Sequence, residues 1–258
     1  MYMVLALNFS EIMQACRQDY KPFEGEVPAG RSPRSLIAAI MAAKEDDRRP
    51  VIAEIKPSSP TEGKIRPAAD PGRLAADFAA AGACGISVLT EPRHFGGSLG
   101  HLVRAARAPV PVLRKDFLFD EAQIRESLYY GADTALLISS FFDADGLARM
   151  IREARRHGME PLVEVHDRAD IERAAACSAR LYAINNRDRH TLRVDRGRTA
   201  ALARHVDGMT VSASGIGTIA ELDEALEHCD AALIGTALMK AADPGAALQR
   251  LVYGDRDD

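Results

Sequence analysis

Eight short apolar segments recur along this chain, separated by longer amphipathic stretches. The segments are rich in Val, Ile and Leu and do not alternate with polar residues, which is typical of strands buried on both faces. The amphipathic stretches between them show the periodicity of helices. We therefore predict strands at residues 51–56, 85–89, 111–115, 134–138, 161–165, 181–185, 209–212 and 231–235.

The intervening stretches are predicted as helices. Gly82, Gly131 and Gly158 each follow such a stretch, as expected of glycines that end a helix before the next strand. Eight strands that alternate with helices over about 200 residues predict a (β/α)8 TIM barrel. A doubly wound open sheet is the alternative, but no GxGxxG sequence follows any predicted strand. The predicted helices are 72–81, 98–106, 121–130, 145–157, 168–176, 196–205 and 219–228.

The length of 258 residues is ordinary for a single α/β barrel domain. Residues 1–50 are expected to form a helical extension of that domain, and residues 51–258 the barrel itself. Within the extension, Asn8 or Ser10 is positioned to cap a first helix that runs through Cys16. A polar stretch with Pro and Gly follows at 21–33, and an Ala-rich helix is predicted over 35–47.

Charge and composition exclude several classes of function. The net charge of −4 provides no basic field for nucleic acid or an anionic membrane. The first nine residues are apolar but follow no basic segment, so they resemble neither a signal peptide nor a membrane span, and a cytoplasmic location is expected.

The four cysteines lie far apart without a CxxC pair, which predicts buried reduced thiols. No His/Asp/Glu cluster has the spacing of metal ligands, so no metal is expected.

Several predicted strands end in polar or charged residues. Alternate residues of a strand share a face, so Glu54 and Lys56 point together, and Lys115, Glu164 and Asn185 end three other strands. Barrel enzymes place their sites at these C-terminal strand ends. A salt bridge that closes the barrel mouth is an equally good interpretation of Glu54 and Lys56. Catalysis is the better interpretation of Lys115 and Glu164, because unpaired charge inside apolar strands is costly.

Three neighbouring polar residues are given structural roles. Arg114 and Asp116 are expected to face the helix layer and form ion pairs there, because they alternate with Lys115. His166 shares a face with Glu164, and we expect it to form structural hydrogen bonds.

Two glycine-rich turns follow the last two strands, SASGIG at 212–217 and IGTALM at 234–239. Backbone N–H groups in such turns hold phosphate, and in barrels the loops after strands seven and eight are the usual phosphate site. Ordinary strand-to-helix turns remain the alternative. Phe95, Phe117 and Leu136 are candidates to line a pocket for a flat aromatic group, although plain core explains them equally well. The residues thus predict a barrel that acts on a phosphorylated molecule by Lys/Glu acid–base chemistry.

With these motifs, the chain resembles the indole-3-glycerol phosphate synthase family over nearly its whole length. The resemblance implies a carboxy-lyase of tryptophan biosynthesis that needs no cofactor. The family closes the pyrrole ring of 1-(o-carboxyphenylamino)-1-deoxyribulose 5-phosphate with loss of CO2 and water. The blocks that carry the resemblance are AEIKPSSP (53–60), SVLTEPRHFGGS (87–98), VLRKDF (112–117) with GAD (131–133), LVEVHD (162–167), INNR (184–187), SASGI (212–216) and LIGTALM (233–239).

The resemblance also implies a role for each catalytic candidate. Lys115 is the implied general acid at ring closure, and Glu164 the acid–base partner in dehydration. Lys56 is placed to interact with anionic groups of the substrate, with Glu54 orienting it and contacting a hydroxyl. Asn185 is the implied hydrogen-bond partner of the sugar chain. Which lysine handles which proton is left open.

The implied substrate-binding residues fall into three groups. Arg187 braces the loop after the sixth strand. The other two groups hold phosphate (Ser59, Ser214, Gly215, Gly235 and Thr236) and pack on the anthranilate ring (Pro60, Phe95, Phe117 and Leu136). The implied partners are a phosphorylated small molecule and other enzymes of tryptophan biosynthesis, with neither nucleic acid nor membrane.

One position departs from the family pattern. The family usually has glutamate before the serine of the SASG block, where this chain has Ala213. The change removes a hydrogen-bond acceptor and a negative charge near two lysines, which predicts a working but slower enzyme. Two alternatives remain: another phosphate-binding barrel enzyme, such as a phosphoribosyl isomerase, and a catalytically silent barrel that serves as an interaction partner.

Overall fold

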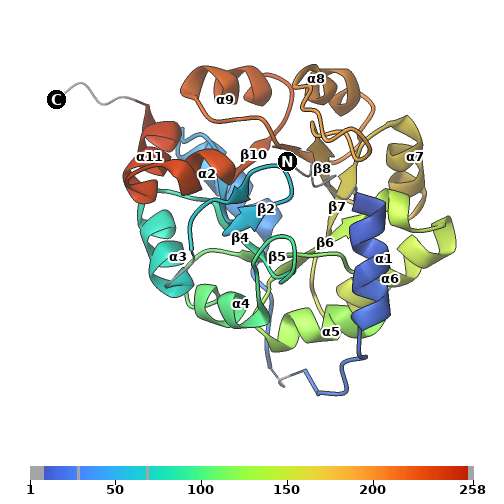
Figure 1. Cartoon of the computed structure of the whole chain (residues 1–258). Helices are drawn as coiled ribbons and strands as arrows, with labels where there is room; N and C mark the ends of the chain where they lie inside the picture. The colour runs from blue at the N-terminus through green and yellow to red at the C-terminus, as the bar shows by residue number, and fades with distance from the viewer. Residues whose placement is uncertain (1–8, 28–29, 68–69, 255–258) are drawn as a thin grey trace, which may run out of the picture.

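A closed barrel of eight parallel strands forms the centre of the molecule (Figure 1). The computed structural model describes residues 9–27, 30–67 and 70–254. The barrel prediction is confirmed, and each strand ends within one residue of its predicted bounds. Around the barrel the strands run in the order β1-β10-β9-β8-β7-β6-β5-β4. They are β1 (Val51–Ile55), β4 (Gly85–Leu89), β5 (Val112–Lys115), β6 (Thr134–Ile138), β7 (Leu162–Val165), β8 (Leu181–Asn185), β9 (Met209–Ala213) and β10 (Ala231–Ile234).

Helices surround the strands, and the seven predicted between strands are present within two residues of their predicted ends. Gly82, Gly131 and Gly158 have φ values of 95°, 100° and 73°, so these helices end in the left-handed conformation that glycine adopts without strain. The helices are α3 (Pro71–Ala80), α4 (Leu99–Ala105), α5 (Glu121–Tyr129), α6 (Ala144–Arg156), α7 (Arg168–Ala176), α8 (Gly197–Ala203), α9 (Ile219–Leu226), α10 (Thr236–Lys240) and α11 (Pro244–Tyr253).

The predicted ranges left out a hairpin, a short turn and two helices. A hairpin of β2 (Ser58–Ser59) and β3 (Gly63–Lys64) lies in the loop after β1, and a single turn, η1 (Ser139–Phe141), follows β6. Strands of two residues are too short to show a hydrophobic period. The two helices are α10 and α11, which both follow β10, and α11 begins at Pro244 after the N-cap Asp243.

Alternate side chains of each strand enter two different cores. Ile52, Leu113 and Leu162 belong to an inner cluster inside the barrel, whereas Val51 and Val112 pack between strands and helices. This alternation is the period-2 pattern of a strand. Because Glu54, Lys115 and Glu164 follow the inner set by two residues, the alternation directs them toward the barrel axis as well.

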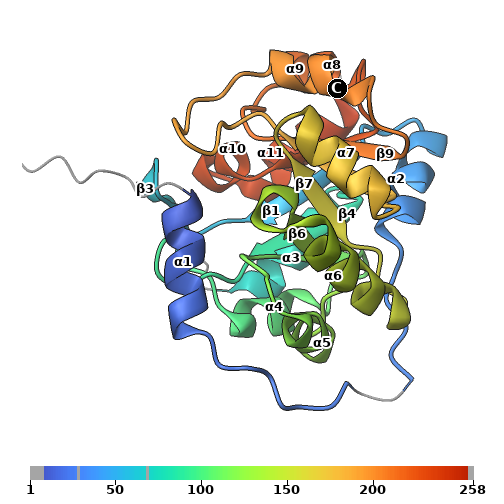
Figure 2. The ribbon, with the colours of Figure 1, turned by 90° about the vertical axis from the view of Figure 1, so that its right-hand side faces the viewer.

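Two helices of the extension lie at opposite ends of the barrel (Figure 2). Leu36 and Ile40 of α2 (Leu36–Glu45) join the inner cluster, and Leu36 approaches Gly85 at the start of β4. Helix α1 (Phe9–Asp19) lies at the C-terminal strand ends. Ser10 is inside α1, so its prediction as a cap is wrong, and Asn8 lies outside the described residues. The barrel is therefore plugged by α2 at one end and opens under α1 at the other.

All four cysteines are free thiols. Cys84 and Cys229 are buried as predicted, but Cys16 and Cys177 are half-buried, so the prediction is wrong for this pair. Both lie at helix positions near the surface, Cys16 in α1 and Cys177 at the C-cap of α7.

Within the described residues, no helix combines the length and the apolar character that crossing a membrane requires.

Candidate active site

One cavity at the C-terminal ends of the strands brings all the predicted site residues together. Its empty volume is about 980 Å³, part of it open to solvent. Strands, strand-to-helix loops and α1 all contribute to its wall. The predicted residues that line it are Glu54, Lys56, Ser59, Pro60, Phe95, Lys115, Phe117, Leu136, Glu164, Asn185, Arg187, Ser214, Gly215, Gly235 and Thr236.

Glu54 and Lys56 form an ion pair at the mouth of the barrel. Lys56 Nζ lies 3.1 Å from Glu54 Oε1, and Ser87 donates to Glu54 Oε2 at 3.4 Å. Burial opposes ionisation of Glu54, but the charges of Lys56 and Lys115 outweigh it and hold the pKa of Glu54 below its ordinary value. The ion pair is thus present and lines the cavity, so the structure is compatible with either interpretation from the sequence.

Glu164 and Lys115 approach the same cavity from β7 and β5. The Glu164 side chain is 1% exposed. Its Oε1 lies 3.4 Å from Nε2 of His166, while its Oε2 has no hydrogen-bond partner within the described part of the chain. Lys115 ends β5 half-buried, and its charge acts on Glu54. A carboxylate with an unengaged oxygen and a lysine in one cavity can serve as base and acid.

The two strand neighbours of Lys115 form the predicted ion pairs. Arg114 lies 3.2 Å from Asp116 and 2.8 Å from Glu126 of α5, so it belongs to the interface between barrel and helices. Asp116 also accepts a hydrogen bond from Thr90 at 2.5 Å and reaches the edge of the cavity. The prediction for His166 is only partly right. Its backbone N–H donates to Asp170, but its ring forms no hydrogen bond within the described residues.

Aromatic rings form one wall of the cavity. Phe9, Phe95 and Phe117 line the cavity, and the ring centroid of Phe117 lies 6.1 Å from that of Phe9 and 6.1 Å from that of Phe95. These edge-on and tilted arrangements are those that aromatic pairs prefer. Phe9 was not predicted, because its place in the cavity depends on how α1 packs across the mouth. The wall is suited to a planar aromatic group.

Glu91, also not predicted, fixes the loop that carries Phe95. Its buried carboxylate accepts the backbone N–H groups of Arg93, His94 and Phe95 at 2.9, 2.7 and 2.9 Å. Three such bonds hold the turn after β4 in one conformation. The sequence signal that could have identified Glu91 is a glutamate just after a predicted strand, in LTEPRHF.

The two glycine-rich turns lie side by side, because β9 pairs with β10. Ser214 and Gly215 have φ values of 73° and 83°. The N–H groups of Gly217 and Thr218 are already bound to Glu221 of α9, at 2.9 and 3.2 Å. This leaves the backbone of Ser214 and Gly215, with the turn before α10, as the part of the turns suited to an anion.

Asn185 and Arg187 order the loop after β8. Asn185 Oδ1 accepts the backbone N–H of Arg187 at 2.9 Å, which orients the Asn185 amide hydrogens for another acceptor. Arg187 donates to the carbonyl of Leu192 at 2.8 Å, which brings Leu192 to the cavity wall. Burial lowers the pKa of Arg187. These contacts support the predicted bracing role.

No group of three or more His, Cys, Asp or Glu residues suited to a metal ion occurs in the described ranges.

Comparison with known proteins agrees with this geometry. The model of the indole-3-glycerol phosphate synthase family matches residues 8–251. The chain belongs to the indole-3-glycerol phosphate synthase family. Indole-3-glycerol phosphate synthase 1 of Streptomyces coelicolor is 42% identical over 217 residues, which cover 82% of this chain and 80% of the relative. The synthase of Beutenbergia cavernae is 39% identical over 253 residues, which cover 94% and 93% of the two chains.

Solved structures of other barrels resemble this chain in fold alone. A 3-hexulose-6-phosphate synthase superposes with a TM-score of 0.63 at 18% identity, covering 78% of this chain and 97% of that one. The tryptophan synthase α chain of Legionella pneumophila gives 0.60 at 13% identity, covering 84% and 95%. Ala213 is buried at the cavity wall beside Asn185 of β8 and Leu233 of β10.

Proposed function

We propose that this cavity catalyses the indole-3-glycerol phosphate synthase reaction on 1-(o-carboxyphenylamino)-1-deoxyribulose 5-phosphate. The observation that carries the proposal is the joint placement of three features in one cavity. These are a lysine and carboxylate at strand ends, an aromatic wall and two adjacent glycine-rich turns. Each matches one part of the substrate: the reacting carbonyl, the anthranilate ring and the phosphate.

The residues account for each step of the reaction. The ring carbon that bears the carboxylate attacks the ribulose carbonyl, and Lys115 protonates the oxygen as the new carbon–carbon bond forms. Loss of CO2 returns the bonding electrons to the ring and restores its aromaticity. The hydroxyl then leaves as water while a proton is lost from the adjacent carbon, with Glu164 as the acid–base partner. A positioned acid or base contributes about 10²–10⁴-fold to such steps.

Binding is assigned to the remaining residues of the cavity. Lys56, oriented by Glu54, contacts anionic groups of the substrate, and Asn185 donates to the sugar hydroxyls. Arg187 braces the loop after β8 through its hydrogen bond to the carbonyl of Leu192. The phosphate is assigned to Ser59, Ser214, Gly215, Gly235 and Thr236, and the anthranilate ring to Pro60, Phe95, Phe117 and Leu136.

The test is a fluorescence assay for the indole product. Wild-type protein should convert the substrate, and Lys115→Ala should lose about 10²–10⁴-fold in kcat. Lys44→Ala is the matched control. Lys44 lies on α2, at the end of the barrel opposite the cavity, and pairs there with Asp230 at 2.8 Å. Absence of turnover by folded wild-type protein would instead support the silent barrel.

Ala213 is tested separately. If the missing carboxylate limits the rate, Ala213→Glu should raise kcat/KM. A fall or no change would mean that the cavity has been rebuilt around alanine.

We also infer a cytoplasmic location and association with other enzymes of tryptophan biosynthesis, both from the biosynthetic role of the family. Fractionation of cells that express the tagged chain tests the first. Co-purification with those enzymes tests the second, and migration of the chain alone in every preparation would contradict it.

A further inference from the structure

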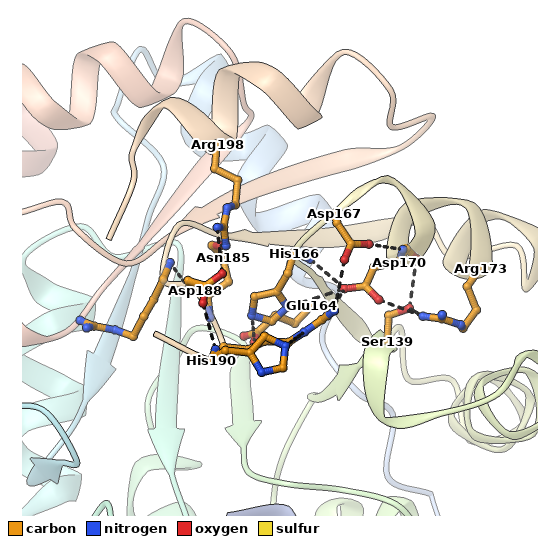
Figure 3. Close-up of polar contacts among 12 residues, drawn as sticks. Ser139, Glu164, His166, Asp167, Asp170, Arg173, Asn185, Asp188, His190 and Arg198 are labelled. Carbon is orange, nitrogen blue, oxygen red and sulfur yellow. Dashed lines mark hydrogen bonds and ion pairs between the residues drawn. The ribbon is translucent and has the colours of Figure 1, made fainter. Parts of the chain in front are cut away.

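The ring of His166 lies between two buried carboxylates (Figure 3). Its Nε2 is 3.4 Å from Glu164 Oε1, and its Nδ1 is 3.7 Å from Asp170 Oδ2. The side chain is 4% exposed and does not line the cavity. A carboxylate oxygen only accepts hydrogen bonds, so each ring nitrogen attracts its neighbour when it carries hydrogen. The ring therefore connects the catalytic candidate Glu164 to Asp170 behind it.

Asp170 is a fixed anchor for this arrangement. Its Oδ2 accepts the backbone N–H of His166 at 3.0 Å and Arg189 at 3.1 Å, and its Oδ1 accepts Arg173 at 2.9 Å. Burial opposes ionisation of Asp170, but His166, Arg173 and Arg189 outweigh it and hold its pKa below the ordinary value. Helix α7 begins three residues earlier at its N-cap Asp167, which binds Arg189 as well.

Glu164 itself has few other contacts that fix its carboxylate. Within the described residues, the ring of His166 is the neighbour at Oε1, and Oε2 has none. Oε2 is itself buried, so the neighbour of Oε1 is the polar group best placed to fix how the carboxylate is turned in the cavity wall. The histidine that contacts Glu164 in this way does not itself line the cavity.

We propose that His166 is a positioning residue that holds Glu164 in its reactive orientation through Nε2, braced at Nδ1 by Asp170. The inference rests on the proposed function, because it concerns the residue assigned there to dehydration. Since Glu164 acts in the chemical steps, loss of its orientation should lower kcat and leave KM nearly unchanged. A displacement of about 1 Å costs about 100-fold in such steps.

Two substitutions of His166 separate its two contacts. His166→Gln keeps an amide donor near the place of Nε2, whereas His166→Asn keeps one near Nδ1 and is too short to reach Glu164. We expect His166→Asn to lose about 10–100-fold in kcat with KM within about twofold, and His166→Gln to recover most of that loss. Thermal unfolding of both variants verifies that they are folded.

His157→Gln is the matched control. His157 Nε2 lies 3.3 Å from Glu153 Oε1 at the end of α6, a histidine–carboxylate pair outside the cavity, so its kinetics should equal those of wild type. Three outcomes would overturn the positioning role: a loss of kcat in His166→Gln alone, equal losses of kcat in both His166 variants, or wild-type kcat in both. Wild-type protein without turnover would refute the proposed function itself, and the inference with it.

Discussion

The contact between Gly235 and Glu54 gives the most specific prediction about the cavity. A Cβ at position 235 would lie 2.5 Å from Glu54 Oε1, 3.0 Å from Glu54 Cβ and 3.1 Å from Glu54 Cδ. Three atoms of one side chain are therefore too close at once, and rotation of the carboxylate alone cannot relieve them. Gly235→Ala must displace Glu54 as a whole.

The size of the effect follows from these distances. Favourable contacts between heavy atoms begin near about 3.5 Å, so the carboxylate must move by roughly 1 Å. Glu54 is 2% exposed and paired with Lys56, which leaves it little space to move. Overpacking of this kind costs about 1–3 kcal/mol of the free energy of unfolding. A shift of about 1 Å in the group that orients Lys56 should lower kcat/KM by about 100-fold.

Urea unfolding and the indole fluorescence assay measure the two effects. Gly245→Ala is the control, because its Cβ would be no closer than 3.4 Å to any neighbour and lies in α11, away from the cavity. A double variant, Gly235→Ala with Glu54→Ala, should be less destabilised than the sum of its two single changes, since Glu54→Ala removes the clashing Oε1 and Cδ and leaves only Cβ, at 3.0 Å.

The reasoning is refuted if Gly235→Ala keeps wild-type stability and kcat/KM. It is also refuted if the double variant is as destabilised as the sum of its single changes, because the clash would then involve atoms other than those of Glu54.

Three further predictions concern stability and the thiols. Asp133 is 3% exposed and binds Arg34 at 2.6 Å and the N–H of Val112 at 2.9 Å, so Asp133→Asn should lower the free energy of unfolding by about 3 kcal/mol in urea titrations. Burial raises the pKa of Cys84 to about 12 and that of Cys229 to about 11, so at pH 8 iodoacetamide should leave both unmodified in the native protein and alkylate them in urea, as read by mass spectrometry. The folded-state pKa of Asp170 is depressed, so its ionised form stabilises the protein above the ordinary Asp pKa of about 3.9, and this contribution is lost as pH falls through the folded value. Asp170→Asn should therefore be destabilised at pH 7, and the difference from wild type should shrink below about pH 4; a difference independent of pH would contradict this.

The barrel and the strand-end residues were predictable because they depend on local periodicity. Alternation along a strand places Glu54 and Lys56 on one face, and their ion pair at 3.1 Å follows directly from it. The same rule separates Lys115, which reaches the cavity, from Arg114, which binds Glu126 of α5.

What the sequence did not reveal depends on contacts between distant segments. Phe9 enters the cavity only because α1 crosses the mouth, and Glu91 matters through three backbone N–H groups of its own loop. His166 lies between two carboxylates only because α7 places Asp170, four residues later in the chain, close to the end of β7. No hydrophobic periodicity and no sequence motif marks any of these contacts.

The charged groups of the cavity differ in whether the protein itself supplies their partners. Glu91 is bound to backbone N–H groups, Asp116 to Arg114 and Glu54 to Lys56. Within the described residues, Lys115 forms no ion pair and Glu164 keeps one oxygen without a partner. Leaving charge unpaired in a buried or half-buried site costs stability, and a ligand that completes the pairing removes that cost. Those two groups are therefore the ones that a substrate would engage, which is why Lys115→Ala and the displacement of Glu164 are expected to change kcat rather than the fold.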